Sequence, residues 1–561
     1  MTYADAVAAV TAPGERFETT EVNIRGTTVT VFRNAPPSLR EIVASTRGRG
    51  DEVFLAYEDE RWTFAQFADT VDALAAALVD RYGISKGDRV AIGMRNYPEW
   101  VVAFAAITSI GAISVSLNAW WTEDELAYAL EDCGAKVLIA DRERVERSAV
   151  TCARLGIETI AVRSPGVARS GVEQWDDVVV LGAPMPEVVV DPDDDATILY
   201  TSGTTGNPKG AVSTHRAVVQ ALLGFGCRSA IDRLRNRTSE ESAAPRADDP
   251  LAFILVVPLF HVTGCVPVML SCLASGLKLV IMYKWDPERA LELIERERVT
   301  NFVGVPTQNW DLLASPKFAE HDTSSLRSVG GGGAPAPPEL VRRMASKYPK
   351  ASAGIGYGMT ETNAYGPQNG GDDYLTHPTS TGRATPILQI EVRDPDGSPV
   401  PSGERGEIWF KGPHLIRGYW NKPDETAEVI VDGWLRSGDI GRVDDEGFVY
   451  VEDRAKDMVL RGGENVYCAE VEAALYEHPK VHEAAVFGVP HERLGEEVAA
   501  AVMPVVGETV TVEELQAHVG GRLAPFKVPS TIVIVDEPLP RNASGKILKR
   551  ELRDQLSDTR Q

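Results

Sequence analysis

Helical and strand patterns alternate through the first third of the chain. Residues 65–81 are rich in Ala and Leu at helical spacing, and a turn at 83–88 leads into a short apolar strand at 89–93. The alternation continues with helices predicted over 98–110 and 123–133 and strands over 112–117 and 136–140. Such alternation is typical of parallel sheets covered by helices, so the pattern predicts the α/β class.

The pattern changes twice further along the chain. Residues 229–250 are crowded with Arg, Asp, Glu, Ser and Pro, which favours a mobile surface insertion over a binding element. From 387 to 410, short strands alternate with tight turns such as Asp394-Pro-Asp-Gly397. A small β-rich unit is predicted there.

A separate C-terminal segment begins near residues 454–457. Beyond it the pattern predicts a compact α+β unit, with helices over 468–477 and 512–522 and strands over 483–489 and 497–505. A chain of 561 residues exceeds the size at which a single hydrophobic core stops growing. We therefore expect two domains, residues 1–455 and 456–561.

Composition and charge narrow the class of protein. The 57 basic and 81 acidic side chains give a net charge of −24, which repels nucleic acid and anionic lipid. The six cysteines form no Cys-x-x-Cys pair, as in a reduced cytosolic protein. The N-terminus has no signal-peptide pattern. Two long uncharged stretches, 100–121 and 251–277, could resemble membrane spans, but they contain Gly or Pro and are better explained as buried helix-turn-strand pieces. We expect a cytoplasmic protein with no nucleic-acid partner and no transmembrane segment.

The strongest local signal is a glycine-rich loop, Tyr200-Thr-Ser-Gly-Thr-Thr-Gly-Asn-Pro-Lys-Gly210, between an apolar strand at 196–199 and a helix that starts near His215. Its glycines let backbone N–H groups converge on an anion. Hydroxyl donors and a positive charge are supplied by Thr201, Ser202, Thr204, Thr205 and Lys209. It is not a Walker A motif, because no Gly-Lys-Ser/Thr opens the helix. The alternative is a flexible polar loop. The Ser, Thr and Lys residues grouped among three glycines after a buried strand disfavour it.

This loop resembles the phosphate loop of the adenylate-forming superfamily, which comprises acyl-CoA synthetases, firefly luciferases and the adenylation domains of peptide synthetases. The resemblance extends from about Val53 to Arg550, with six motifs in the family's order. It implies a large N-terminal domain of two βαβ-type subdomains plus a small β-barrel, followed by a small mobile α+β C-terminal domain. Fatty-acid and 4-coumarate CoA ligases are the branch that the chain resembles most.

The resemblance implies that the loop, including Gly203 and Gly206, binds the phosphates of ATP and that Lys209 contacts the β- and γ-phosphates. In Gly356-Tyr-Gly-Met-Thr-Glu-Thr362, Glu361 would hold Mg²⁺ with Thr201. Hard oxygen ligands of this kind suit magnesium. Tyr357 would stack on adenine and Thr360 would contact the α-phosphate.

Glycine-rich segments are implied to form walls of the same site. In Gly330-Gly-Gly-Gly-Ala-Pro335 the backbone would lie flat against adenine and the acyl group, where a side chain would clash. The implied wall residues are Gly333, Ala334, Pro335, Gly356, Gly358 and Met359. Ile355 departs from the Gln or Asn of many relatives.

His261, in Pro258-Leu-Phe-His-Val-Thr-Gly264, is implied to line the site of the acyl carboxylate. A lone His in apolar surroundings is more often a hydrogen-bonded core residue, so its role depends on the resemblance. Adenylation domains for α-amino acids carry an aspartate at this position. The histidine therefore argues against an amino-acid substrate.

The remaining implied roles lie near and beyond the domain boundary. Asp439 suits the ribose hydroxyls, Arg454 would reach the same ribose, and Lys456 falls at the family's hinge. Gly462 and Gly463 would line the pantetheine tunnel, and Lys546 would bridge the attacking carboxylate and the α-phosphate. Cys468 stands where relatives often have proline, and we interpret it as a packing substitution and not as a nucleophile.

These roles describe an ATP-dependent carboxylic acid–CoA ligase with an acyl-AMP intermediate. The attacking carboxylate and the phosphates of ATP are all negatively charged, and each pair of these charges would repel by about 1 to 4 kcal/mol at close range. Lys209, Mg²⁺ and Lys546 are therefore needed as cations. A roomy apolar pocket and a medium- or long-chain fatty acid are suggested by His261, Val262 and Thr263 together with the small residues Gly332, Gly333, Gly356 and Ala364. The alternatives are an aryl or arylalkanoic acid, an acyl-AMP ligase that loads a carrier protein in trans, a luciferase-like oxygenase and an inactive ligand-binding protein. A homodimer is the oligomeric state considered.

Overall fold

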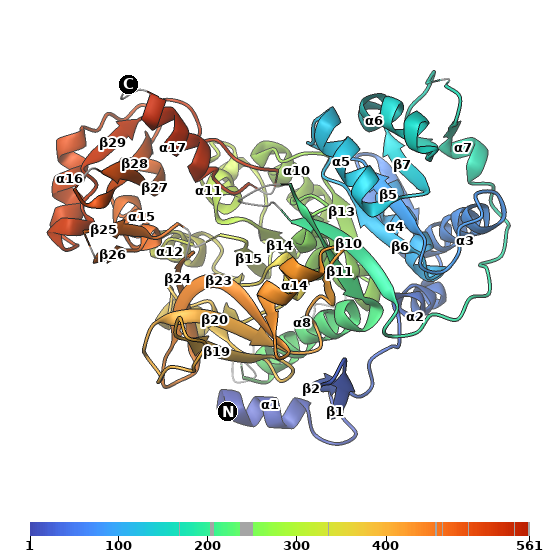
Figure 1. Cartoon of the computed structure of the whole chain (residues 1–561), viewed down its shortest axis with the longest axis horizontal. Helices are drawn as coiled ribbons and strands as arrows, with labels where there is room; N and C mark the ends of the chain where they lie inside the picture. Colours follow the sequence, from blue (N-terminus) through green and yellow to red (C-terminus); the bar gives the residue numbers. More distant parts are fainter. Residues whose placement is uncertain are drawn as a thin grey trace.

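The computed structural model describes most of the chain (Figure 1). The described residues are 1–167, 169–201, 207–235, 251–334, 336–454, 457–462, 464–491, 493–543 and 545–558. We refer to the part before residue 455 as the large domain and to the part after residue 456 as the C-terminal domain. The expected boundary itself falls on residues outside those described.

The first sheet of the large domain has eight strands in the order β21-β11-β10-β6-β5-β7-β8-β9. The six strands from β10 to β9 are parallel, as the alternating pattern predicts. Its strands are β5 (Arg89–Gly93), β6 (Ile113–Ser116), β7 (Val137–Asp141), β8 (Glu158–Val162), β9 (Val172–Gln174), β10 (Asp195–Thr201), β11 (Lys209–Thr214) and β21 (Gly418–Tyr419). Its helices are α3 (Phe64–Asp80), α4 (Pro98–Ser109), α5 (Glu123–Cys133), α6 (Arg142–Leu155) and α7 (Trp175–Val178). Every residue of α4 is buried, which agrees with its largely apolar sequence, and its one charged residue, Glu99, accepts a hydrogen bond from Arg163 at 2.9 Å.

The second sheet combines a parallel part with the β-rich unit predicted over 387–410. Strands β3, β13, β12, β14, β15 and β16 run parallel, and β17 and β18 connect them to antiparallel β24, β23, β20 and β19. The strands are β3 (Val53–Tyr57), β4 (Glu60–Thr63), β12 (Ala252–Leu255), β13 (Lys278–Ile281), β14 (Asn301–Gly304), β15 (Ser328–Gly332), β16 (Ser352–Gly356), β17 (Gln368–Gly370), β18 (Gly382–Arg383), β19 (Gln389–Arg393), β20 (Gly406–Lys411), β22 (Ile430–Val431), β23 (Trp434–Val443) and β24 (Phe448–Arg454). The helices are a π-helix (Gly264–Leu270), α9 (Ser271–Ser275), α10 (Pro287–Glu297), α11 (Pro306–Ala314), α12 (Pro338–Lys347), α13 (Asp372–Thr376) and α14 (Pro423–Val429).

The C-terminal domain is an α+β unit built on a sheet of order β26-β25-β28-β27, with β29 beside β28. Separate hydrophobic clusters include alternate residues of β27 and β28, so both faces of the sheet are covered. Its elements are β25 (Val459–Arg461), β26 (Glu464–Val466), α15 (Cys468–Tyr476), β27 (Val481–His491), β28 (Gly495–Pro504), α16 (Val512–Gly520), β29 (Thr531–Ile534) and α17 (Lys549–Asp558). The four elements predicted here are confirmed to within a few residues.

The helix expected near His215 begins at that residue, after β11 has returned antiparallel to β10. The prediction of a mobile insertion over 229–250 was wrong for residues 229–235. Helix α8 (His215–Arg235) continues into the segment predicted as a mobile insertion. Its charged residues are ordered by partners: Arg228 Nε donates to Asp232 at 2.9 Å, and Arg235 Nη2 donates to Asp373 at 2.9 Å. The rest of that prediction, residues 236–250, lies outside the described part.

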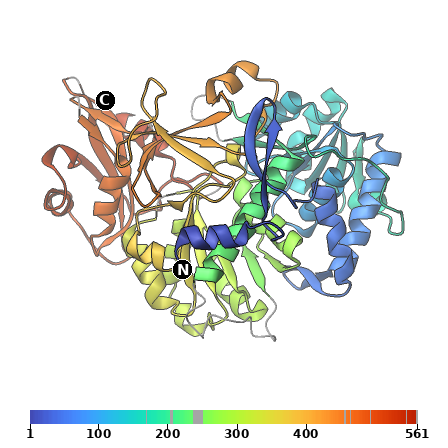
Figure 2. The same ribbon diagram turned by 90° about the horizontal axis from the view of Figure 1, so that it is seen from below.

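The N-terminal residues pack against the rest of the large domain. Helix α1 (Tyr3–Val10) runs along α8 (Figure 2), and the Tyr3 hydroxyl donates to the Ala384 carbonyl at 2.9 Å. It is followed by β1 (Thr19–Ile24), β2 (Thr27–Phe32) and α2 (Leu39–Ser45). The two apolar stretches flagged in the sequence fold as helix-turn-strand pieces, as expected. Of the helices described, none combines the length and apolarity that crossing a bilayer requires.

Candidate active site

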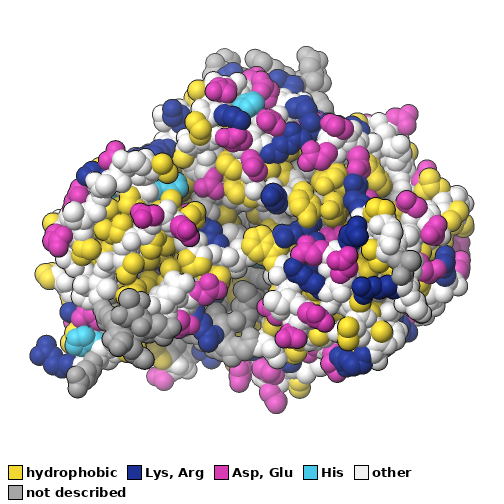
Figure 3. All heavy atoms as spheres, turned by 90° about the horizontal axis from the view of Figure 1, so that it is seen from above, with side chains coloured by type: hydrophobic (Ala, Val, Ile, Leu, Met, Phe, Trp, Pro, Cys, Tyr) yellow, Lys and Arg dark blue, Asp and Glu magenta, His cyan; other side chains and the backbone are white. Residues whose placement is uncertain are grey.

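The predicted site residues of the large domain come from strands of its two sheets and from the segments that follow these strands. The space-filling view from above shows a hollow between the two domains (Figure 3). Eight of the predicted residues lie outside the described part of the chain: Ser202, Gly203, Thr204, Thr205, Gly206, Pro335, Lys456 and Gly463.

The expected phosphate side of the site is the loop end of the β10–β11 hairpin. Thr201 ends β10 and pairs with Lys209, the first residue of β11, so the two residues bracket the glycine-rich loop. The Thr201 hydroxyl donates to the Lys209 carbonyl at 3.4 Å. The hairpin therefore fixes the two ends of the loop even though the loop itself is not described.

Glu361 stands beside this hairpin in a short 3₁₀ turn (Thr360–Thr362). Its side chain is 7% exposed, and Tyr419 Oη donates to its Oε1 at 2.8 Å. Burial raises the pKa of the Glu361 carboxyl, and the Tyr419 hydrogen bond opposes that rise. Sequence reasoning missed Tyr419, because a single tyrosine in the two-residue strand β21 carries no spacing or composition signal.

The predicted ribose pair lies on the adjacent strands β23 and β24. Asp439 and Arg454 are directly opposite each other, with Arg454 Nε 3.4 Å from Asp439 Oδ1. The Tyr357 hydroxyl donates to the other oxygen of Asp439. Burial raises the pKa of Asp439, and Arg454 and Tyr357 oppose the shift. Tyr357, Asp439 and Arg454 thus form one connected group.

Lys546 reaches this group from the C-terminal domain. Its turn is held by Asn542, whose Oδ1 accepts the Lys546 N–H at 2.9 Å and whose carbonyl accepts the Gly545 N–H at 2.9 Å. A Cβ on Gly545 would come within 2.9 Å of Val305 Cγ2 of the large domain, so the turn packs tightly against that domain. Burial lowers the pKa of Lys546 to about 8, and the charge of Arg454 adds to the effect. Lys546 therefore lies within electrostatic reach of Arg454.

The predicted glycine walls form three adjacent strands. Gly331 on β15 pairs with Gly304 on β14, and Gly332 pairs with Gly356 on β16. Gly333 follows with a φ of +79°, which favours glycine, and Ala334 comes next. Gly358, Met359 and Thr360 lead from β16 to Glu361. Ile355, the departure from the family pattern, pairs with Gly331 and Asn369.

His261 lies just before the π-helix, and among the described residues its ring has a local hydrogen-bond partner. Its Nδ1 accepts the Thr263 N–H at 3.3 Å. Burial lowers the pKa of His261 to about 4. The imidazole is therefore neutral near pH 7 and contributes no positive charge to the site.

The hairpin that carries Gly462 is turned away from these residues. Gly462 joins β25 to β26, and its N–H donates to Leu494 of the same domain at 2.8 Å. In Figure 1 this hairpin lies on the flank of the C-terminal domain away from β10 and β11. Cys468 is fully buried, its thiol donates to the Asp457 carbonyl at 3.1 Å, and burial raises its pKa, in agreement with a packing role.

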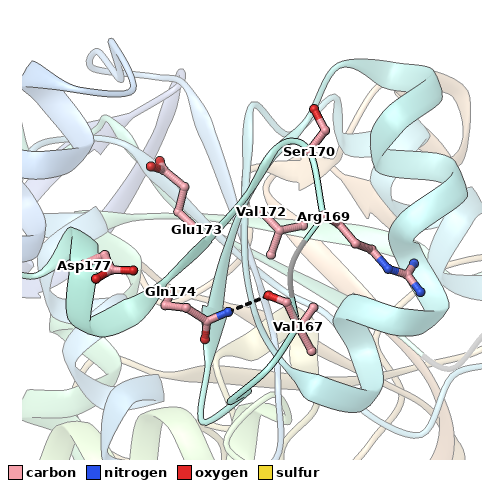
Figure 4. A pocket seen from close by; sticks show the side chains of 7 residues that line it. All are labelled: Val167, Arg169, Ser170, Val172, Glu173, Gln174 and Asp177. Atoms are coloured by element: carbon pink, nitrogen blue, oxygen red, sulfur yellow. Dashed lines mark hydrogen bonds between the residues drawn. The ribbon is translucent and has the colours of Figure 1, made fainter.

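A separate pocket of about 560 Å³ lies at the opposite edge of the eight-stranded sheet (Figure 4). It is formed around β9, the strand farthest from the β10–β11 hairpin in that half of the sheet. Gln174 Nε2 donates across it to the Val167 carbonyl at 2.9 Å. None of the predicted site residues lines it.

Both parts of the chain match known families. Residues 42–420 match the model of the AMP-binding enzymes, and residues 470–546 match the model of the AMP-binding enzyme C-terminal domain. The chain belongs to the AMP-binding enzyme family. The resemblance to adenylate-forming enzymes is thus confirmed, and the chain is an ATP-dependent, AMP-forming acid–thiol ligase.

Individual relatives cover nearly the whole chain. Over 512 residues it is 36% identical to the long-chain-fatty-acid–CoA ligase FadD13 of Mycobacterium tuberculosis, with 89% of this chain and 94% of the relative covered. Over 501 residues it is 37% identical to a feruloyl-CoA synthase of an Amycolatopsis species, with 88% and 93% covered. The ATP-bound structure of MatB from Rhodopseudomonas palustris matches with a TM-score of 0.80 and 31% identity, covering 93% of this chain and 100% of MatB.

Proposed function

We propose that this family member ligates a medium- or long-chain fatty acid to coenzyme A through an acyl-adenylate. The observation that carries the proposal is the position of Lys546. This lysine, from the far end of the chain, lies within electrostatic reach of the Asp439–Arg454 pair, and its turn packs against Val305 of the large domain. A ribose held by that pair would bring the α-phosphate of ATP close to the Lys546 ammonium.

In the adenylation step, the chain's own residues supply charge and alignment. Lys209 and the amides of the glycine-rich loop bind the β- and γ-phosphates, while Thr360 and Lys546 contact the α-phosphate. Asp439 and Arg454 hold the ribose, and Tyr357 stacks on adenine. The substrate carboxylate then attacks the α-phosphorus and pyrophosphate leaves. Preorganised cations lower this barrier because they offset repulsion between the carboxylate and the triphosphate.

Glu361 and Thr201 are suited to hold Mg²⁺ together with the phosphates of ATP. Glu361 is buried and has no ion-pair partner within 4 Å among the described residues, so its charge fits a divalent cation. The described residues contain no group of three or more His, Cys, Asp or Glu side chains placed to hold a metal, so the substrate's phosphates would complete the ligand set. When bound, Mg²⁺ would neutralise the negative charge of the phosphates.

The thioester step requires the C-terminal domain to turn. Rotation about Lys456 would withdraw Lys546 and bring the Gly462-Gly463 loop to the site, where two glycines leave room for the thin pantetheine chain. The thiol of coenzyme A would then attack the acyl carbonyl and release AMP. The position of Gly462 on the outer flank fits a domain that is oriented for adenylation.

The fatty-acid preference is supported by the surroundings of His261. The imidazole is neutral, and Gly332, Gly333 and Gly356, which we assign to the wall of the acyl site, add no charge. Arg228 is buried in α8, and its Nε and Nη1 donate to Asp232 and to the Gln368 carbonyl. An aryl or arylalkanoic acid is the second candidate, favoured by the similarity to the feruloyl-CoA synthase.

A substrate screen tests the proposal. Purified enzyme with ATP and Mg²⁺ is offered carboxylic acids of graded chain length and aromaticity, with and without coenzyme A. We expect pyrophosphate release to be greatest with medium- or long-chain fatty acids, and an acyl-CoA thioester to appear only with coenzyme A. Preference for ferulate or related acids would select the second candidate. Acyl-AMP without thioester would contradict coenzyme A as the acceptor.

The pH dependence of adenylation tests the role of Lys546. Because its pKa is lowered to about 8, the free enzyme loses the ammonium charge above that pH. We expect kcat/KM for ATP in the adenylation step to fall above about pH 8, since this ratio reports ionisations of the free enzyme. In Lys546→Arg the guanidinium stays charged, so the fall should move to higher pH. An identical alkaline limb in both proteins would contradict the assignment.

A further inference from the structure

Tyr419 lies between Glu361 and Lys209, to which the proposed function assigns the binding of Mg²⁺ and of the ATP phosphates. Its hydroxyl donates to Glu361 Oε1 at 2.8 Å. The ammonium nitrogen of Lys209 lies 5.1 Å from the centroid of its ring. The side chain is nearly buried, at 8% exposure. One tyrosine therefore contacts both the predicted magnesium ligand and the predicted phosphate-binding lysine.

The backbone around Tyr419 is fixed to both partners. Strand β21 pairs with β11, which begins at Lys209, and the Trp420 N–H donates to the Gly210 carbonyl at 2.8 Å. On the other side, the Ile416 N–H donates to the Glu361 carbonyl at 3.0 Å. Segment 416–420 thus joins the phosphate-loop hairpin to the turn that carries Glu361.

The neighbouring residues leave Tyr419 little freedom. A Cβ at Gly418 would come within 2.7 Å of Thr426, and Gly418 has a φ of +151°, so only glycine fits there. The Thr426 hydroxyl in turn accepts the Tyr419 N–H at 2.8 Å. The ring and hydroxyl of Tyr419 are therefore presented in one orientation.

We propose that Tyr419 is a positioning residue for the metal–nucleotide complex. Its hydroxyl fixes one oxygen of Glu361, so that the carboxylate presents its other lone pairs to the cation in a set direction. Its ring face attracts the Lys209 ammonium and aligns that side chain beside the loop. Residues that orient a metal ligand through a hydrogen bond usually change metal affinity when they are replaced. The inference rests on the proposed role of Glu361.

The two contacts can be separated by two substitutions. Tyr419→Phe keeps the ring beneath Lys209 and removes only the hydroxyl. We expect its affinity for ATP in EDTA to equal that of the wild type, while the Mg²⁺ concentration needed for tight ATP binding rises by about 10-fold or more. Tyr419→Leu also removes the aromatic face, so it should weaken ATP binding in EDTA as well.

Calorimetric titration of ATP, without any acid substrate, measures these affinities at a series of Mg²⁺ concentrations. In a parallel assay of adenylation, Tyr419→Phe should show a raised KM for Mg²⁺ and a kcat near the wild-type value at saturating Mg²⁺. Tyr82→Phe is the matched control, because the Tyr82 hydroxyl also donates to a carboxylate, Glu173 at 2.6 Å, in the region of β9. It should bind ATP and Mg²⁺ as the wild type does.

Wild-type magnesium dependence in Tyr419→Phe would overturn the role of the hydroxyl, and equal weakening with and without metal would do the same. Unchanged binding of ATP in EDTA by Tyr419→Leu would overturn the role of the ring. Failure of the proposed function is a different result: the wild-type enzyme itself would then release no pyrophosphate with any acid offered.

Discussion

Replacing Lys546 by alanine is expected to slow acyl-adenylate formation by about 10²- to 10³-fold, the range typical for loss of one preorganised electrostatic contact. Lys546 is the cation that the C-terminal domain brings to the Asp439–Arg454 pair. Its loss leaves the repulsion between the attacking carboxylate and the α-phosphate without its nearest counter-charge. Thioester formation from supplied acyl-adenylate should continue near the wild-type rate, because the proposed rotation removes Lys546 before that step.

The two half-reactions are measured separately, as exchange of labelled pyrophosphate into ATP and as thioester formation from synthetic acyl-AMP and coenzyme A. Lys527→Ala serves as a control, since this lysine of the same domain pairs with Glu470 at 2.6 Å and has no assigned role. It should leave both rates unchanged. Equal loss of both half-reactions in Lys546→Ala would contradict a role confined to adenylation.

The sequence predicted Asp439, Arg454 and Lys546 as members of one site, because each belongs to a motif with a fixed order along the chain. The structure pairs Asp439 with Arg454 and places Lys546 within electrostatic reach of both, while their roles stay predictions. Tyr419 was missed because its significance arises only when β21 pairs with β11, about two hundred residues earlier. Residues 229–235 were predicted to belong to a mobile insertion but continue helix α8, because their charges have distant partners, such as Asp373 for Arg235. Pairings of this kind depend on tertiary structure and leave no local pattern.

The glycine walls illustrate a second limit of the sequence. Their composition predicts a close approach, but it does not say what approaches each glycine. A Cβ at Gly331 would lie 2.3 Å from the carbonyl oxygen of Gly304 on the neighbouring strand. A Cβ at Gly356 would have Gln368 Cγ at 3.8 Å as its nearest neighbour, an ordinary contact. The fold therefore requires glycine at position 331. At position 356 the fold would accept a side chain, so only a bound ligand could require glycine there.

Alanine substitutions should separate these two requirements. Gly331→Ala forces a backbone shift between β14 and β15, and we expect the free energy of unfolding to fall by about 3 kcal/mol. Gly356→Ala should change it by less than about 1 kcal/mol, because the methyl group meets no backbone and restricts the unfolded chain slightly. Denaturant unfolding measures both values, provided that the transition of the large domain is resolved.

The second half of this prediction concerns binding. Gly356→Ala should fold normally yet show a raised KM for ATP or for the acid, since the proposed wall contact at Gly356 allows no side chain. Gly397→Ala is not a suitable control, because its φ of +84° strains any other residue. Gly48 is suitable, since it has no atom within 4 Å of a Cβ and no positive φ. If Gly356→Ala binds ATP and acid as tightly as Gly48→Ala, the backbone of β16 is not a wall of the site. The glycines of this strand would then serve only its pairing with β15.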